Sequence, residues 1–194
     1  MSFSATLASL PTDIIETARL LLRVIKPETM TQLYTVTSSA EEHRSFLGIR
    51  SDKEYALFRE RYSPGMTTFF FSYRHFIIHE KATGVFMGRC DYHTWQLRHF
   101  RAEIGYALNE EYKGKGYMRE ALKAVLIHGF EDMELHRVEA FIGPENERSL
   151  KLVQHFGFKE EGLLREHYYH QDKWVDSACF SLLRGEYDEL KHRW

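Results

Sequence analysis

A glycine-rich segment between a strand and a helix restricts the folds open to this chain more than any other feature. Lys113-Gly114-Lys115-Gly116 places two glycines and two lysines directly before an amphipathic helical pattern. Glycine permits a positive φ and a close approach of backbone to ligand, and a helix start offers unpaired N–H groups at the positive end of the helix dipole. The segment therefore predicts a backbone cradle for a phosphate or another anion.

The residues on either side of the glycines give the order strand, loop, helix. Residues 102–108 alternate as a strand does, and residues 109–111 form the turn that follows. Beyond the loop, apolar residues recur at three- and four-residue steps, which indicates one face of a helix: Met118, Ala121, Leu122, Val125, Gly129 and Met133.

Two nucleotide-binding designs share this order, and the spacing excludes both. A Walker loop has four residues between its glycines and then Lys followed by Ser or Thr, which this chain lacks. The dinucleotide fingerprint has a third glycine three residues after Gly116, where Arg119 stands. A shorter Gly-x-Gly anion loop remains.

The segment from Asn109 to Ala124 resembles the Gly-x-Gly loop of the GNAT acyltransferases, and the likeness extends in both directions. Upstream, residues 16–23 are similar to the first strand of the branch that contains the ribosomal-protein N-terminal acetyltransferases. Downstream, several segments match that branch in the same order: Asn146 to Ser149 as Asn-x-x-Ser, Gly157 to Gly162 as Gly-Phe-x-x-Glu-Gly, the turn and strand at 172–176, and Tyr187.

The predicted fold is one α/β (α+β) domain across residues 1–194, with its core at about 16–187. The patterns predict a mixed, mostly antiparallel sheet flanked by helices. Strands are expected at 20–25, 69–80, 83–94, 102–108, 137–142, 158–169 and 173–183, and helices at 27–38, 40–62 and 146–156, besides the helix after the glycines. The resemblance implies the GNAT fold, in which the central strand and its parallel neighbour splay apart in a V.

The resemblance also implies acetyl-CoA as the co-substrate, and no metal is expected. The loop would hold the pyrophosphate through Lys113, Gly114, Lys115, Gly116, Tyr117 and Met118. Leu108 and Asn109 would bond the pantetheine arm as a neighbouring strand would, with Asn146 as a further contact. Lys113, Lys115 and Arg119 can supply the local positive charge, since the net charge of −2 gives no basic field across the chain.

Moving an acetyl group from a thioester to an amine requires a neutral amine, a donor for the developing oxyanion and a proton for the departing sulfur. Glu103 occupies the position where many GNAT enzymes place a base that works through water; the alternative is an ordinary outward-facing strand residue. Many relatives protonate the thiolate with a tyrosine at the position that is Val153 here. In the ribosomal branch the serine of Asn-x-x-Ser has this role, and the resemblance implies it for Ser149, which stands at that position. Alternatively, Asn146 caps the helix and Ser149 satisfies its first turn.

The pKa of the acceptor favours a protein N-terminus. An α-amino group titrates near about 8 and a lysine near about 10.4, so far more of the α-amine is neutral at neutral pH. A small amine such as a polyamine, an amino acid or an antibiotic is the alternative acceptor. A non-catalytic acyl-CoA sensor is the alternative outside the enzyme class, and Val153 favours it.

Composition and charge exclude several other classes of protein. The net charge of −2 argues against direct nucleic-acid binding, and no apolar run approaches the length of a membrane span. The first twelve residues lack the pattern of a secretory signal, and Cys90 and Cys179 are too few for a disulfide framework. We therefore expect a cytoplasmic protein, monomeric or homodimeric, with both cysteines in packing roles.

Overall fold

An eight-stranded mixed sheet forms the frame of the protein in a computed structural model, which describes residues 10, 12–62 and 71–194. The strand order is β1-β2-β3-β4-β5-β6-β8-β7, and every neighbouring pair is antiparallel except β5 and β6. The strands are β1 (Ile14–Glu16), β2 (Leu20–Ile25), β3 (Phe71–Glu80), β4 (Phe86–Gln96), β5 (Arg101–Leu108), β6 (Arg137–Ile142), β7 (Lys159–His170) and β8 (Lys173–Leu183).

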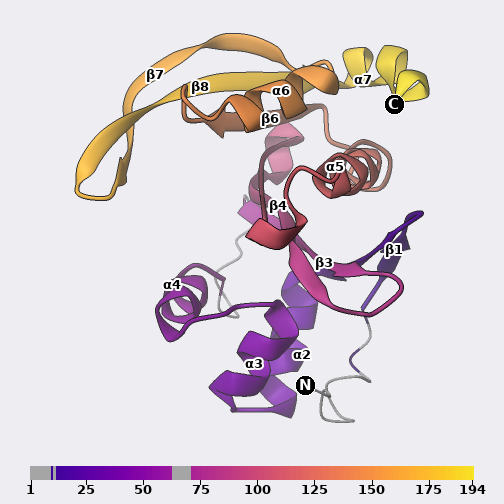
Figure 1. Ribbon diagram of the computed structural model, residues 1–194, viewed down its shortest axis with the longest axis vertical. Helices are drawn as coiled ribbons and strands as arrows, with labels where there is room; N and C mark the ends of the chain where they lie inside the picture. Colours follow the sequence, from indigo (N-terminus) through magenta and orange to yellow (C-terminus); the bar gives the residue numbers. More distant parts are fainter. Residues whose placement is uncertain (1–9, 11, 63–70) are drawn as a thin grey trace.

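The helices gather at different parts of this sheet, as Figure 1 shows. α2, α3 and α4 lie together in the lower part of the view, α5 lies above β1 and β3, and α6 lies beside β6 and β8. The long β7–β8 hairpin extends sideways as an arm. The helices are α2 (Pro27–Val36), α3 (Ala40–Leu47), α4 (Asp52–Tyr62), α5 (Tyr117–Ile127), α6 (Glu147–His155) and α7 (Arg184–Leu190).

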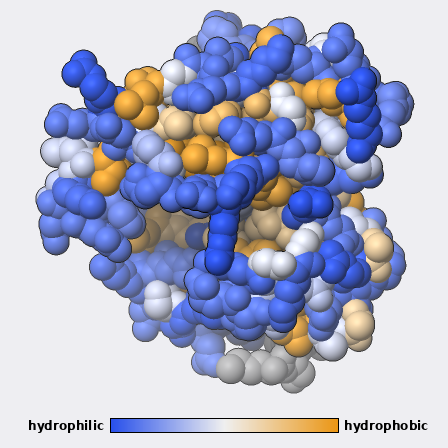
Figure 2. All heavy atoms as spheres, turned by 45° about the horizontal axis from the view of Figure 1, so that its top comes forward, coloured by the Kyte–Doolittle hydropathy of each residue, from blue (hydrophilic) through white to orange (hydrophobic). Residues whose placement is uncertain are grey.

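Two hydrophobic clusters bury opposite faces of the sheet. The larger cluster joins α5 and α6 to one face of the sheet, where Tyr92 and Ile104 are buried. The smaller cluster packs α2, α3 and α4 against the other face through Tyr73 and Ile77. Alternation along β4 and β5 therefore leaves Asp91, His93, Glu103 and other polar residues on the face opposite α5. Figure 2 shows a mostly hydrophilic surface with hydrophobic atoms visible where it is hollowed.

Several predicted boundaries differ from the structure. The helix expected at 40–62 is two helices, because Gly48 adopts φ 66° and ends α3, after which the Ser51 hydroxyl accepts a hydrogen bond from the Glu54 N–H at 3.1 Å at the start of α4. β4 starts at Phe86 instead of residue 83, since the turn after β3 extends through Gly84 at φ 71°. The predictions for residues 1–9, 11, 69 and 70 lie outside the described residues.

Both cysteines are free thiols, as the sequence predicts. Cys90 is buried in the larger cluster and Cys179 is partly buried, and burial raises the pKa of both thiols above the usual value. Among the described residues, no helix is long and apolar enough to cross a membrane. Within the same ranges, no group of three or more His, Cys, Asp or Glu side chains is placed to hold a metal ion.

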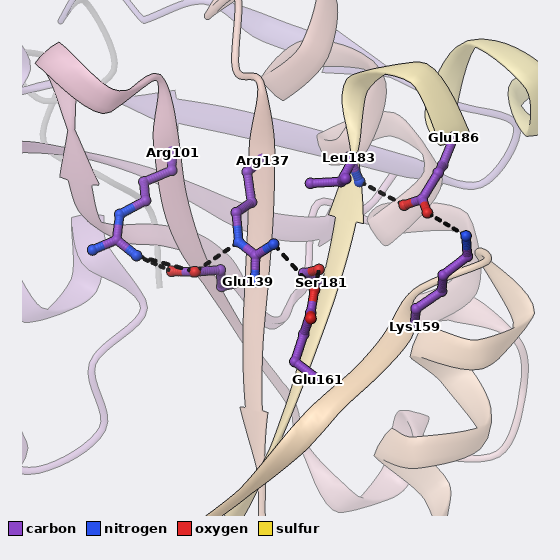
Figure 3. Close-up of polar contacts among 8 residues, drawn as sticks. All are labelled: Arg101, Arg137, Glu139, Lys159, Glu161, Ser181, Leu183 and Glu186. Atoms are coloured by element: carbon purple, nitrogen blue, oxygen red, sulfur yellow. Dashed lines mark hydrogen bonds and ion pairs between the residues drawn. The ribbon is translucent and has the colours of Figure 1, made fainter.

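The two parallel strands separate as predicted. β5 and β6 pair only from Arg101 to Glu103, opposite Arg137 to Glu139, although β5 continues to Leu108 and β6 to Ile142. The remaining lengths of the two strands are unpaired with each other and form a V that opens toward the glycine loop. Figure 3 shows the polar contacts at the closed end of the V, which run from Arg101 through Glu139 and Arg137 to Glu161.

Candidate active site

The glycine loop opens directly onto the first turn of α5. Gly114 and Gly116 have φ values of 75° and 80°, the left-handed conformation that favours glycine, and Gly116 is the N-cap of the helix. A Cβ at Gly114 would meet no atom within 4 Å, so the loop surface is open. The first helical hydrogen bond runs from the Glu120 N–H to the Gly116 carbonyl at 3.1 Å, and the three preceding N–H groups have no partner one turn earlier. This arrangement fits a diphosphate.

Arg19, which the sequence analysis did not assign to the site, holds the loop from the side. Its Nε donates to Glu120 Oε2 at 2.6 Å and its Nη1 to the Lys115 carbonyl at 3.1 Å, while the guanidinium lies 4.3 Å from the centre of the Tyr117 ring. Burial alone raises the pKa of Glu120, but hydrogen bonds from Thr17 and Arg19 outweigh it and lower the pKa. In the sequence, Arg19 was noted only as part of residues 16–23, which resemble the first strand of the ribosomal branch.

The two loop lysines differ in their contacts. Lys113 donates to Glu110 Oε1 at 2.5 Å, so a neighbouring carboxylate offsets its charge. Lys115 and Arg119 are exposed at the start of α5. The positive field of the loop therefore comes mainly from these two side chains and from the helix dipole, since Glu120 offsets the charge of Arg19 in the same way.

Asn109 joins the loop to β4. Its backbone N–H donates to the Met87 carbonyl at 2.9 Å, and its side-chain amide donates to the Phe86 carbonyl at 3.3 Å. Its own carbonyl accepts the Tyr112 N–H at 3.0 Å. Contact with pantetheine stays a prediction for Leu108 and Asn109, and the structure shows Asn109 as an anchor that fixes where the loop begins.

On the far side of the V, Asn146 and Ser149 lie at the start of α6. The Asn146 side chain accepts the Ser149 N–H at 3.2 Å and caps the helix. The Tyr106 hydroxyl, from β5, donates to the Ser149 carbonyl at 3.5 Å, and burial raises the pKa of Tyr106 to about 12. Val153 is fully buried in the larger cluster.

A cleft of about 740 Å³ opens on the face of the sheet opposite α5. α4 forms one wall, and β4 and β5 form the other. Its lining has more acidic than basic side chains, with Glu54, Glu60 and Asp91 against Arg89 and His93. The complete lining is Glu54, Leu57, Phe58, Glu60, Tyr62, Arg89, Asp91, His93, Gly105, Tyr106 and Ala107.

Glu103 lies beside this cleft and is hydrogen-bonded on two sides. Its Oε1 accepts His93 Nε2 at 2.9 Å and the Tyr168 hydroxyl from β7 at 3.1 Å. Burial alone raises the pKa of Glu103, but the interactions with His93 and Tyr168 outweigh it, so the pKa lies below its usual value. Neither His93 nor Tyr168 was a predicted site residue. They lie on different strands from Glu103, so no spacing pattern along the sequence could identify the three residues as a group.

The site therefore has two halves that meet where the sheet is open. Glu103 lies beside the acidic cleft, behind His93, whereas the glycine loop, Asn146 and Ser149 lie toward the side of α5 and α6. Residues 19–159 match the family model described as "Acetyltransferase (GNAT) domain". The chain belongs to this family.

Individual relatives support the assignment. The chain is 38% identical over 112 residues to the uncharacterized N-acetyltransferase p20 of Bacillus licheniformis, which covers 58% of the chain and 63% of that relative. It is 32% identical over 79 residues to the ribosomal protein uS5-alanine N-acetyltransferase of Escherichia coli, which covers 41% of each chain. The fold is similar to that of the spermidine/spermine N-acetyltransferase SpeG from Vibrio cholerae, with a TM-score of 0.63 at 21% identity, over 88% of this chain and 98% of that one.

Proposed function

We propose that this GNAT-family protein transfers the acetyl group of acetyl-CoA to a primary amine, and that the acceptor is the N-terminal α-amine of a protein. The observation that carries the proposal is the V between β5 and β6. It joins an open glycine cradle on one side of the sheet to an acidic cleft on the other. Two substrates can therefore meet in one ternary complex without competing for the same opening.

The chain's own residues fit acetyl-CoA on the α5 side. The open backbone at 114–118 suits a diphosphate, and Asn146 and the unpaired edge of β5 toward Leu108 suit the pantetheine arm. The thioester supplies the acetyl group when bound. Ser149, at the first turn of α6, is the proposed donor of a proton to the departing sulfur.

Glu103 and the cleft would serve the amine. Arg89 contacts Glu54 at 3.1 Å and Asp91 at 3.6 Å, so one arginine offsets part of the charge of two carboxylates. With Glu60, the carboxylates of the lining still outnumber this arginine and attract an ammonium. Glu103, on the same side of the sheet, belongs to the machinery that removes the proton. An α-amine needs less help to become neutral than a lysine does, because its pKa is lower by about 2 to 3 units.

The choice of a protein N-terminus rests on that pKa argument and on one relative. The uS5 enzyme of Escherichia coli is named for acetylating the alanine of a ribosomal protein. The cleft also supports a second candidate, a small polycationic amine, because its acidic residues can hold a second ammonium group of the same molecule. The two candidates differ in the acceptors that they predict.

Acetylation of an acceptor panel tests the proposal. Purified protein is incubated with acetyl-CoA, and a thiol reagent detects the released coenzyme. Peptides with a free α-amine should be acetylated, and matched peptides with a blocked N-terminus and an internal lysine should not. Preferential acetylation of spermidine would favour the small-amine candidate. If calorimetry detects acetyl-CoA binding but no amine is acetylated, the proposed enzymatic function is overturned, and the non-catalytic acyl-CoA sensor is favoured.

A further inference from the structure

His93 stands between Glu103 and the proposed acceptor cleft. It belongs to β4, lines the cleft, and has a side chain 24% exposed. Glu103 is 16% exposed, is not part of the cleft lining, and contacts His93 Nε2 at 2.9 Å. An amine in the cleft can therefore reach the imidazole more directly than the carboxylate.

We propose that His93 is the group that takes the proton from the acceptor ammonium, and that Glu103 is a positioning residue that orients the imidazole. This assignment rests on the proposed acetyl transfer and specifies its base. It changes the role of Glu103, for which the family resemblance implied a base that works through water.

The hydrogen bonds fix which ring nitrogen is available. With Nε2 donating to Glu103, the neutral ring carries its lone pair on Nδ1. No hydrogen bond engages Nδ1 in the part of the chain that the structure describes. Tyr168 donates to the same Glu103 oxygen at 3.1 Å and so fixes the carboxylate from the hairpin side.

Gly105 allows the ring to lie against the central strand. A Cβ at this position would fall 2.6 Å from His93 Cε1 and 3.2 Å from Nδ1, so any side chain here would displace the imidazole. The ring edge that carries Nδ1 therefore lies over β5, two residues beyond the point where β5 and β6 separate. This is where an amine from the cleft would meet a thioester in the V.

The chemistry of the two groups supports the same division of roles. The two hydrogen bonds keep Glu103 a carboxylate, which makes it a weak base at neutral pH. Imidazoles as a class titrate near about 6.5, close to the optimum for a general base at physiological pH. A histidine oriented by a carboxylate is the better-suited acceptor of a proton.

Charged and titratable groups of β4 itself and of two other elements surround His93. Asp91 and Arg89 are on the same face of β4, Glu54 and Glu60 are on α4 across the cleft, and Tyr168 is on β7. Arg89 contacts both Glu54 and Asp91, at 3.1 Å and 3.6 Å. Together with Glu103, the carboxylates outnumber the single arginine. They stabilise the imidazolium that forms when His93 accepts a proton.

The protons and bonds balance as follows. Nδ1 of His93 accepts one proton from R–NH₃⁺ and later releases it to solvent. The neutral nitrogen forms the new C–N bond to the acetyl carbon, and the C–S bond breaks. The nitrogen loses a second proton, and the sulfur gains one to leave as a thiol, so the sum is amide, free thiol and one proton released.

The pH profile of kcat/KM separates His93 from Glu103. His93→Gln retains a donor toward Glu103 but has no titrating nitrogen, so kcat should fall about 100-fold to 1,000-fold and the acidic limb should disappear. Glu103→Gln should lower kcat less, by about tenfold, and move the acidic limb to lower pH, since the imidazolium loses its carboxylate. Acetyl-CoA affinity, measured by calorimetry, should be unchanged in both.

His99→Gln is the matched control, since His99 is exposed in the turn between β4 and β5, and its profile should equal that of the wild type. A limb that survives His93→Gln and disappears in Glu103→Gln would overturn the proposal. ¹⁵N NMR of the protein without substrates should show the Nε2–H form of His93, and the opposite tautomer would also overturn it. Failure of the wild type to acetylate any amine would remove the proposed function itself, whichever tautomer NMR reports.

Discussion

At Ser149, the structural role in the helix cap can be tested separately from the proposed chemical role. The cap of α6 is made by the Asn146 side chain, which accepts the Ser149 N–H at 3.2 Å. The Ser149 hydroxyl is therefore not needed for the cap. Its removal leaves the helix start intact and tests only the chemistry.

Ser149→Ala should lower kcat by about 100-fold, with little change in the KM for acetyl-CoA, because general acid catalysis commonly contributes about 10² to 10⁴. Steady-state kinetics with the best acceptor of the panel checks this. Asn146→Ala is the matched control for the cap and should lower the free energy of unfolding by about 1 kcal/mol. Unchanged kcat in Ser149→Ala would remove Ser149 from the mechanism.

At the residue scale, the sequence predicts positions better than partners. Gly114 and Gly116 were identified because a positive φ before a helix leaves a local trace in the sequence. His93 and Tyr168 were missed because they reach Glu103 from other strands, at separations of 10 and 65 residues in the chain. Contacts across strands depend on register, which no local pattern fixes.

At the scale of elements, Arg19 joins the start of β2 to the start of α5. Arg19→Met removes its bonds to Glu120 and the Lys115 carbonyl but keeps an apolar side chain over Tyr117. The loop should become less ordered before ligand binds, at a cost of about 1 kcal/mol. The KM for acetyl-CoA should rise about fivefold while kcat changes little.

Lys81→Met is the control for the loop, because Lys81 pairs with Glu16 at 2.9 Å at the same edge of the sheet without touching the glycines. Its kinetics should match the wild type. An equal rise in KM in both variants would indicate a general loss of stability at this edge. It would contradict a specific role for Arg19.

The closed end of the V depends on Glu139, which lies between two arginines. Arg101 Nη1 and Arg137 Nε contact its Oε1 at 3.1 Å and 2.8 Å, and its side chain is only 12% exposed. Glu139→Gln should lower the free energy of unfolding by about 1 to 3 kcal/mol, since a hydrogen-bonded charge is lost from a mostly buried position. Urea unfolding measures the change.

The exposed pair of Glu147 and Lys151 provides the comparison for Glu139. Both of its side chains are about three-quarters exposed, at 76% and 75%, so Glu147→Gln should cost at most about 0.5 kcal/mol. Similar losses in the two variants would mean that the ion pairs at the V contribute no more than a surface pair.

Among the elements, those with strong local signals were predicted well. β6 and α6 match within one residue because alternation in one, and the Asn146 cap with Gly157 in the other, mark their ends. The break at Gly48 was missed, since a single glycine within a charged helical pattern is compatible with either one helix or two. The V itself came from family resemblance, because the end of strand pairing has no signature in the sequence.

At the scale of the whole molecule, buried histidines should make the fold sensitive to mild acid. Burial, with a smaller contribution from Arg23, lowers the pKa of His79 to about 4, and burial also lowers the pKa of His128. In the unfolded chain a histidine titrates near about 6.5, so the unfolded state binds more protons between these values. The contribution of these histidines to the free energy of unfolding therefore keeps its full value above about pH 6.5, and it decreases as the pH falls toward the pKa of the histidine in the folded protein.

For His79, the shift to about 4 corresponds to a loss of about 2 kcal/mol in the free energy of unfolding between pH 7.5 and pH 5. The carboxylates with lowered pKa values, such as Glu120, add to the loss only at lower pH. Urea unfolding at the two pH values should show this loss in the wild type and in His99→Gln. His79→Gln should show a smaller dependence on pH, whatever its absolute stability, because the group that binds the extra proton on unfolding is gone. An equal dependence on pH in all three proteins would mean that His79 is not kept neutral by the fold.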